Sequence, residues 1–150
     1  MMRGLLTNAV LTQLETAGKP IGDLKKPDGG GWPAGAGANS PGTTFVPYAV
    51  LVPMTATITY GPLADNQADA QIPYTIESYG VDRDQCEWMA DTARGVLAAM
   101  KRTLLDLGDG TYKVQQAFRS SIGGVQRIDG ADPPFYGQSD VVTIWLAKEA

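Results

Sequence analysis

The stretch that decides the fold is Asp82-Arg-Asp-Gln-Cys-Glu-Trp-Met-Ala-Asp-Thr-Ala-Arg-Gly-Val-Leu-Ala-Ala-Met-Lys-Arg-Thr-Leu-Leu105, which has the spacing of one long helix. Successive helical residues are about 100° apart, so its apolar residues fall on two sides. The broad side, typical of a core face, holds Cys86, Met89, Ala90, Ala93, Val96, Leu97, Met100 and Leu104. The far side holds a narrower row, namely Trp88, Thr92, Gly95, Ala99 and Thr103. Because charged residues fill only the sector between them, we expect a second packing partner for this helix, and that partner to be another subunit.

Both ends of this helix are marked in the sequence. Asp82 is suited to cap the first free backbone N–H groups, and Gln85 stands three residues on, where a capping-box partner belongs. Asp84 and Glu87 add negative charge near the positive end of the helix dipole. Gly108 is the expected stop, since glycine commonly follows the last helical turn. The sequence therefore predicts one unbroken helix from Asp82 almost to this glycine.

Length and composition are those of a single-domain globular protein. The chain has 150 residues, of which 43% are hydrophobic, and this corresponds to about one domain. A net charge of -4, without a long basic run, argues against a dedicated nucleic-acid binder.

No apolar run approaches the ~20 residues that span a bilayer. Polar Thr7, Asn8 and Thr12 favour a first helix over a signal peptide. The single cysteine excludes an intramolecular disulfide and suits a reducing compartment.

The residue types that carry catalysis or bind metals form no recognisable constellation. The chain has no histidine, which removes the commonest general base and most zinc sites. Cys86 lies on the core face of the long helix and is expected to be a buried, inert thiol. The glycines of residues 29–42 lack the Gly-Lys-Ser/Thr of a phosphate-binding loop. Acidic residues in or beside loops are expected to be solvated: Asp65, Asp69, Asp129, Asp132 and Asp140. The sequence thus predicts no enzyme, no cofactor and no metal site.

The rest of the chain alternates between helix, strand and loop signals. Apolar residues at helical spacing predict a first helix over residues 3–17, and a Gly/Pro-rich arm follows at 27–44. Alternating residues predict strands at 46–60, 72–79, 111–119 and 141–146, with a Pro/Gly loop at 129–138. The order α-β-β-α-β-β predicts one α+β domain over residues 1–150. Its mainly antiparallel sheet is expected to carry both helices on one face.

Three tryptophans occupy expected outward or arm positions. Trp88 lies on the second row of the long helix, Trp145 on the outward side of the last strand, and Trp32 in the arm. One explanation is a core that wraps both sides of the sheet. The other is a set of protein interfaces, where aromatic anchors are enriched. With the small residues Thr92, Gly95 and Ala99, these tryptophans are our candidate interface residues.

Two segments carry a resemblance to a known family. The first, Ile72-Pro-Tyr-Thr-Ile-Glu-Ser-Tyr-Gly-Val-Asp-Arg-Asp-Gln-Cys-Glu-Trp-Met-Ala-Asp-Thr-Ala-Arg94, leads from a strand straight into the long helix. The second, Phe135-Tyr-Gly-Gln-Ser-Asp-Val-Val-Thr-Ile-Trp-Leu146, is an extended closing strand. Both resemble the tail terminator proteins of phages with long, non-contractile tails, particularly phages of actinobacteria. The resemblance covers most of residues 46–147 and rests on element order, length and the strand-to-helix join.

The resemblance implies a structural virion protein. It implies a ring, usually of six subunits, that caps the head-proximal end of the tail tube, stops tube polymerisation and joins the tube to the neck. The implied partners are other copies of the chain, the tail tube protein and a connector or stopper protein. Genomic DNA would pass through the bore without specific binding. No catalytic residue is implied, and assembly would take place in the host cytoplasm.

Two alternatives stand beside this interpretation. Head–tail stopper or connector proteins of the neck have similar lengths. A small carboxylate-dependent enzyme or ligand-binding module would instead need paired carboxylates in a pocket. Within the ring hypothesis, we expect a neutral or acidic bore, with the acidic loops at 65–69 and 129–132 as candidates for its lining. The opposing view is a basic patch built from Lys25, Lys26, Lys101 and Arg102.

Overall fold

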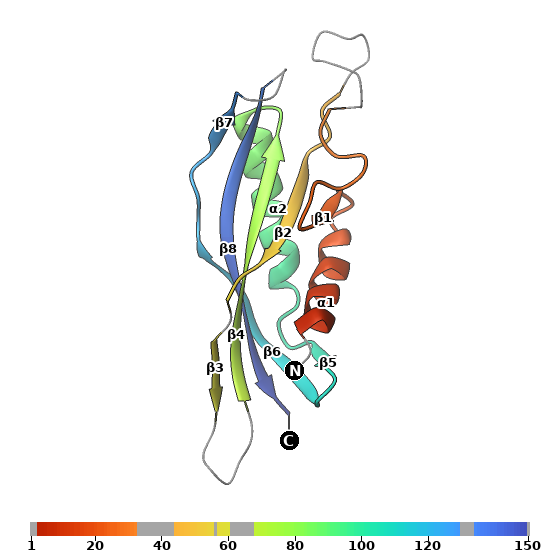
Figure 1. Cartoon of the computed structure of the whole chain (residues 1–150), viewed down its shortest axis with the longest axis vertical. Coiled ribbons are helices and arrows are strands. Elements are labelled where there is room, and N and C mark those ends of the chain that lie inside the picture. The colour runs from red at the N-terminus through yellow and green to blue at the C-terminus, as the bar shows by residue number, and fades with distance from the viewer. Residues whose placement is uncertain (1–2, 33–43, 56, 61–67, 130–133, 150) are drawn as a thin grey trace.

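The computed structural model describes residues 3–32, 44–55, 57–60, 68–129 and 134–149, which form two helices and a curled sheet (Figure 1). In chain order the elements are α1 (Arg3–Glu15), β1 (Ile21–Asp23), β2 (Tyr48–Pro53), β3 (Thr57–Tyr60), β4 (Ala68–Gly80), α2 (Arg83–Ala98), β5 (Leu104–Asp106), β6 (Thr111–Ser121), β7 (Gln126–Ile128) and β8 (Phe135–Lys148). The α+β class predicted from the sequence fits this arrangement.

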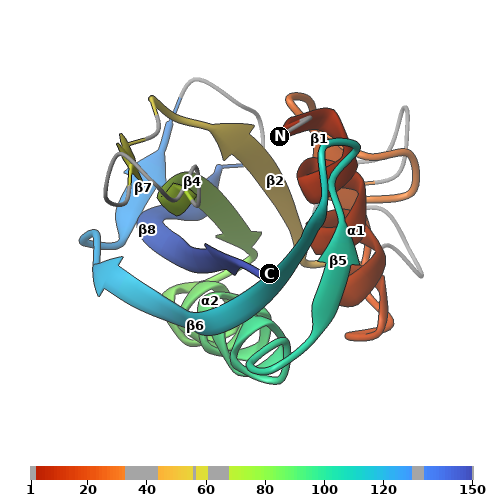
Figure 2. The same cartoon turned by 90° about the horizontal axis from the view of Figure 1, so that it is seen from below.

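The sheet is organised around its two longest strands. β4 and β8 pair antiparallel along nearly their whole length, from Asp69 opposite Ala147 to Gly80 opposite Tyr136. The path across the sheet is β1-β2-β4-β8-β6-β5, while β3 pairs with β4 and β7 with β8. Every pair is antiparallel except β1 with β2, which is parallel. Seen from below, the sheet curls so that its edge strands approach α1 (Figure 2).

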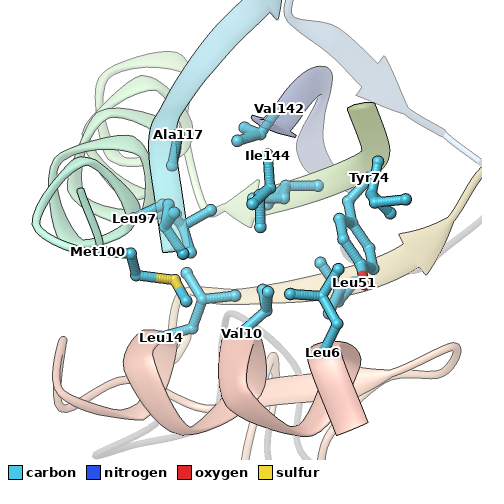
Figure 3. Packing of buried hydrophobic residues seen from close by; sticks show 14 of the residues in the cluster. Leu6, Val10, Leu14, Leu51, Tyr74, Leu97, Met100, Ala117, Val142 and Ile144 are labelled. Carbon is cyan, nitrogen blue, oxygen red and sulfur yellow. The ribbon is translucent and has the colours of Figure 1, made fainter. Parts of the chain in front are cut away.

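Both helices pack on the same face of the sheet. The main core joins Leu6, Val10 and Leu14 of α1 to side chains of α2 and of four strands. Figure 3 shows the α1 side chains pointing toward Leu51 and Ile144 of the sheet, with α2 closing the core at the side. The larger set of fully buried residues includes Ile72, Tyr74, Met89, Leu97, Leu107, Tyr112 and Leu146. This inner face buries the alternate residues of β4 and β8, as strand geometry requires.

The long helix begins as predicted but ends earlier. The Asp82 carboxylate accepts from the Gln85 backbone N–H at 2.8 Å, and the Gln85 side chain accepts from the Val81 N–H at 2.7 Å. Helix α2 stops at Ala98, well before Gly108. The chain then leaves the helical path because the Arg102 N–H donates to the Val114 carbonyl of β6. The prediction of an unbroken helix is therefore wrong.

The early end of α2 also changes which residues reach the core. Leu104, placed on the core face by helical spacing, lies in β5 and is 59% exposed. Met100 stays buried two residues past the helix end. The other expected core residues Cys86, Met89, Ala90, Ala93 and Leu97 are buried, and Val96 is partly buried.

Several strand predictions also need correction. The single strand expected at 46–60 is two strands, β2 and β3, separated after Pro53, where the missing N–H weakens a ladder. Short β1 and β5, and β7 as a separate strand, were not predicted. The expected Pro/Gly loop at 129–138 is wrong beyond Pro134, since β8 begins at Phe135 and continues to Lys148. The element order is therefore α-β-β-β-β-α-β-β-β-β and the sheet is mixed.

Candidate interaction surfaces

The first surface, here called the α2 open face, consists of Trp88, Thr92, Gly95 and Ala99. The structure brings these four predicted residues onto one side of α2, away from the core. Trp88 is 47% exposed, Gly95 and Ala99 are exposed, and Thr92 is half-buried. The Lys19 ammonium lies 5.4 Å from the centre of the Trp88 ring, a distance suited to a cation–π contact. The described residues therefore leave this row without a covering layer.

The second surface lies on the opposite, helix-free face of the sheet. Trp145 of β8 stands there, 41% exposed, between its register partners Gln71 of β4 and Gln116 of β6. The residues directly before and after it in β8, Ile144 and Leu146, point to the opposite side, face the core and are fully buried. Trp145 is thus far from the α2 open face, and the two predicted groups do not form one site.

Trp32 packs within its own chain. Its ring meets the Phe45 ring edge-on, with the ring centres 5.3 Å apart, and Gly31 forms a backbone bridge with Val46. Trp32 and Phe45 belong to a small, mainly aromatic cluster on the outer face of the sheet that also includes Tyr48, Val50, Val52, Tyr79, Val81 and Phe135. The start of the arm at 27–32 is therefore docked. Residues 33–43 of the arm lie outside the described residues.

The sequence did not reveal a buried polar network beside α2. Asp140 is only 3% exposed, so its expected solvation is wrong. Its carboxylate accepts from the Gly123 N–H at 3.0 Å, from the Gln138 amide at 2.9 Å and from Arg119 at 3.4 Å. The same Arg119 nitrogen donates to Asp91 of α2 at 3.0 Å. The signal that would have found this network is strand alternation: Gln138, Asp140 and Val142 face one side once β8 is extended to Phe135.

A groove of about 470 Å³ adjoins this network, between α2 and the segment that joins β6 to β7. Its charged side chains are Arg83, Glu87, Asp91 and Arg119, which form ion pairs: Arg83 with Glu87 at 3.1 Å and Arg119 with Asp91 at 3.0 Å. The carboxylates on this groove are thus partnered by arginines. Such pairing does not favour the carboxylate-dependent enzyme.

The lone cysteine is chemically quiet. Cys86 is fully buried, and its thiol donates to the Ser78 carbonyl at 3.3 Å. Burial, together with the negative charges of Glu87 and Asp140, raises the pKa of this thiol to about 11. The nucleophilic thiolate is therefore scarce at neutral pH, as expected for an inert thiol.

No family model matches the chain, and no curated protein matches it. Within the described residues, no group of three or more His, Cys, Asp or Glu side chains is placed to hold a metal ion. No helix in the same part of the chain is long and apolar enough to cross a membrane.

Proposed function

We propose that this chain is the subunit of a homo-oligomeric ring that caps the head-proximal end of a non-contractile phage tail tube. The ring would have six subunits, stop tube polymerisation and join the tube to a connector or stopper protein in the neck. The observation that carries the proposal is the pair of uncovered aromatic surfaces at Trp88 and Trp145, on opposite sides of the sheet.

Two different surfaces are what a closed ring needs. In a ring each subunit contacts its neighbours through two distinct patches, because a cyclic arrangement joins one patch to another. Exposed tryptophans are also uncommon on monomers and common at the centre of interfaces. The resemblance of residues 72–94 and 135–146 to tail terminators supports the particular assignment. A head–tail stopper would present the same kinds of surface.

Assembly through the α2 open face leads to a first prediction. Replacing Ala99 by glutamate puts a charge on an exposed residue just past the end of α2, so we expect the subunit to stay folded. The ring should be lost, because the carboxylate would be desolvated against a neighbour. Light scattering and electron microscopy report assembly, and circular dichroism reports folding. The matched control is Asn8→Glu on the exposed side of α1, which should assemble normally. A ring formed by Ala99→Glu would contradict this role for the face.

Terminator and stopper differ in what they bind. We expect the purified ring to attach to the ends of tubes assembled from the tail tube protein of the same phage, and to limit their length. Tube length measured by electron microscopy with and without the ring tests this. Unchanged tubes, together with binding to the portal side of the neck, would favour the stopper.

A second prediction concerns DNA. Nonspecific affinity comes mainly from Lys and Arg that displace counterions from phosphates, and here 12 basic residues face 16 acidic ones. We therefore expect no micromolar binding to a fluorescent duplex at low salt, measured by anisotropy. Micromolar binding that falls steeply with added salt would contradict a non-adhesive bore and indicate a connector that grips DNA.

The structure describes only part of the two groups that bear on this prediction. In the acidic loops, Asp69 and Asp129 are exposed, whereas residues 65–67 and 130–132 lie outside the described residues. The opposing basic residues are divided between two places. One pair, at 25–26, follows β1, and the other, at 101–102, follows the end of α2 (Figure 1).

A further inference from the structure

The sheet has a long open edge on the side of β6 and β7. Strand β5 pairs only with the first part of β6, from Thr111 to Lys113, and the chain at 102–103 bonds Val114. Beyond Val114, the described residues place no further strand along the outer side of β6, of residues 122–125 or of β7 (Figure 1). Such an edge presents backbone N–H and C=O groups to any extended chain that lies beside it.

Residues 122–125, here called the linking segment, carry unpaired backbone groups on this edge. The segment accompanies β8 nearly residue for residue between β6 and β7, which keeps it extended. The Gly123 N–H donates to Asp140 of β8 and so points into the sheet. Because successive groups of an extended chain point to opposite sides, Ile122 and Gly124 direct their N–H and C=O groups outward. Within the described residues, no backbone hydrogen bond outside the strand ladders uses these outward groups.

The linking segment lies between two cavities. On the helix side is the groove of about 470 Å³, where Ile122, Val125 and Tyr136 supply apolar lining. On the outer side of the sheet, a second cavity of about 190 Å³ is lined by glycines of the segment together with Tyr79 and Gly137. Side chains of a strand alternate between the two faces of a sheet. An extended chain along the linking segment would therefore place alternate side chains at the two cavities, with the larger ones beside α2.

The charges on the groove indicate which kind of chain fits. The α2 wall carries Glu87 and Asp91, and each carboxylate has its own arginine, Arg83 at 3.1 Å and Arg119 at 3.0 Å. A charged side chain entering the groove would have to compete with one of these pairs, whereas an apolar one would not. Unpaired backbone groups, paired charges and cavities on both sides together suit an uncharged, extended peptide segment.

We propose that the linking segment is a strand-addition site, at which an extended segment of a partner protein joins the sheet beside residues 122–125. The backbone of the partner bonds the outward groups of Ile122 and Gly124. Its alternate apolar side chains enter the groove next to α2. The site goes beyond the proposed ring and does not rest on it, since it uses neither Trp88 nor Trp145.

A library of random nonapeptides displayed on messenger RNA is the probe. Selection on the full-length protein should enrich peptides with uncharged, apolar residues at alternate positions, which bind with dissociation constants of about 100 μM or tighter in fluorescence anisotropy. In the tightest peptide, N-methylation of one alternate set of amides should abolish binding and methylation of the other set should spare it, because strand addition uses every second amide. No enrichment, or equal effects of the two methylated sets, would overturn the proposal.

Gly124 provides a matched pair of variants for the backbone contact. Gly124→Pro removes one outward N–H that has no partner within the described chain, so the subunit should fold, as circular dichroism would report. We expect it to bind the selected peptide about tenfold more weakly or worse, the cost of a lost hydrogen bond. Gly124→Ala keeps the N–H, and its Cβ meets nothing within 4 Å, so it should bind as the wild type does. Equal binding by the two variants would overturn the backbone contact.

Ile122 tests the groove independently of the backbone. Ile122→Asp places a carboxylate on the groove lining, and we expect about a tenfold loss of peptide affinity or more, since an apolar side chain would then be held against a charge. The matched control is Leu104→Asp in β5, because the two leucine and isoleucine side chains are similarly exposed, at 59% and 64%. Wild-type affinity in Ile122→Asp, or an equal loss in Leu104→Asp, would contradict entry of side chains into the groove.

A second copy of the chain is the other occupant that an open edge allows. Sedimentation velocity separates the two, because a site for a partner protein predicts the same self-association for the wild type and Gly124→Pro. Self-association that Gly124→Pro removes would assign the edge to copies of this chain and overturn the partner site. Peptide binding by a protein that never caps tail tubes would support the site and contradict the phage function. Rings that cap tubes while no peptide binds would do the reverse.

Discussion

Gly80→Ala is expected to destabilise the protein by about 3 kcal/mol, at the upper end of typical overpacking costs. Gly80 ends β4 just before the first turn of α2, and a Cβ there would collide with the backbone nitrogen of Cys86 and lie 2.8 Å from the Gln85 carbonyl carbon. Backbone atoms cannot rotate away as a side chain does. The turn is also fixed by its cap, in which the Gln85 N–H donates to Asp82. Urea unfolding followed by circular dichroism measures the loss.

The same substitution at Gly95 is the matched control and should have the opposite sign. Gly95 lies on the exposed side of α2, three residues before its end at Ala98, with free space around it. Alanine restricts the unfolded chain there and favours the helix, so we expect stabilisation of up to about 1 kcal/mol in the monomer. A Gly80→Ala protein as stable as Gly95→Ala would mean that β4 and α2 do not approach as closely as the structure has them.

Asp140→Ala is expected to cost about 3 kcal/mol, because a buried carboxylate is removed from three donors. The Gly123 N–H and the Gln138 amide would lose their acceptor, while Arg119 would keep only Asp91. A side chain on Gly123 would collide with the Ser139 backbone, so the chain passes close to β8 here. Without Asp140, this part of the chain would lose the hydrogen bond that the Gly123 N–H donates. Chemical denaturation gives the free energy of unfolding.

An exposed ion pair provides the control for this buried one. Asp129 pairs with Arg127 at 2.7 Å, shorter than the 3.4 Å between Arg119 and Asp140, yet both of its side chains are more than half exposed. Solvent screening makes such pairs weak, so Asp129→Ala should leave the unfolding midpoint unchanged. If the two alanine variants lost equal stability, burial would not be what makes Asp140 important.

The sequence was sufficient where local signals agree with the final packing. Asp82 and Gln85 marked the start of α2, and helical spacing identified Met89 and Leu97 as core residues. Alternation identified the inner face of β4 and the end of β8, where Ile144 is fully buried. Helical spacing also separated the exposed row that contains Trp88 from the core side of α2. These features follow from periodicities of about 3.6 and 2 residues, which any long element must have.

The sequence was insufficient where a segment takes its structure from a distant one. Strands β1, β5 and β7 have three residues each, too few to show alternation, and they exist because longer strands offer hydrogen-bonding edges. A contact with a distant strand also ends α2 early, because the Arg102 N–H donates to the Val114 carbonyl of β6.

Only the tertiary structure decided the surroundings of the candidate surfaces. It buried Asp140 against Arg119, docked Trp32 on Phe45, and left Trp88 and Trp145 on opposite sides of the sheet. Periodicity determined which residues share a face. Which face meets another part of the chain, and which remains open, depends on contacts between segments far apart in sequence, and these are fixed only when the sheet curls around its helices.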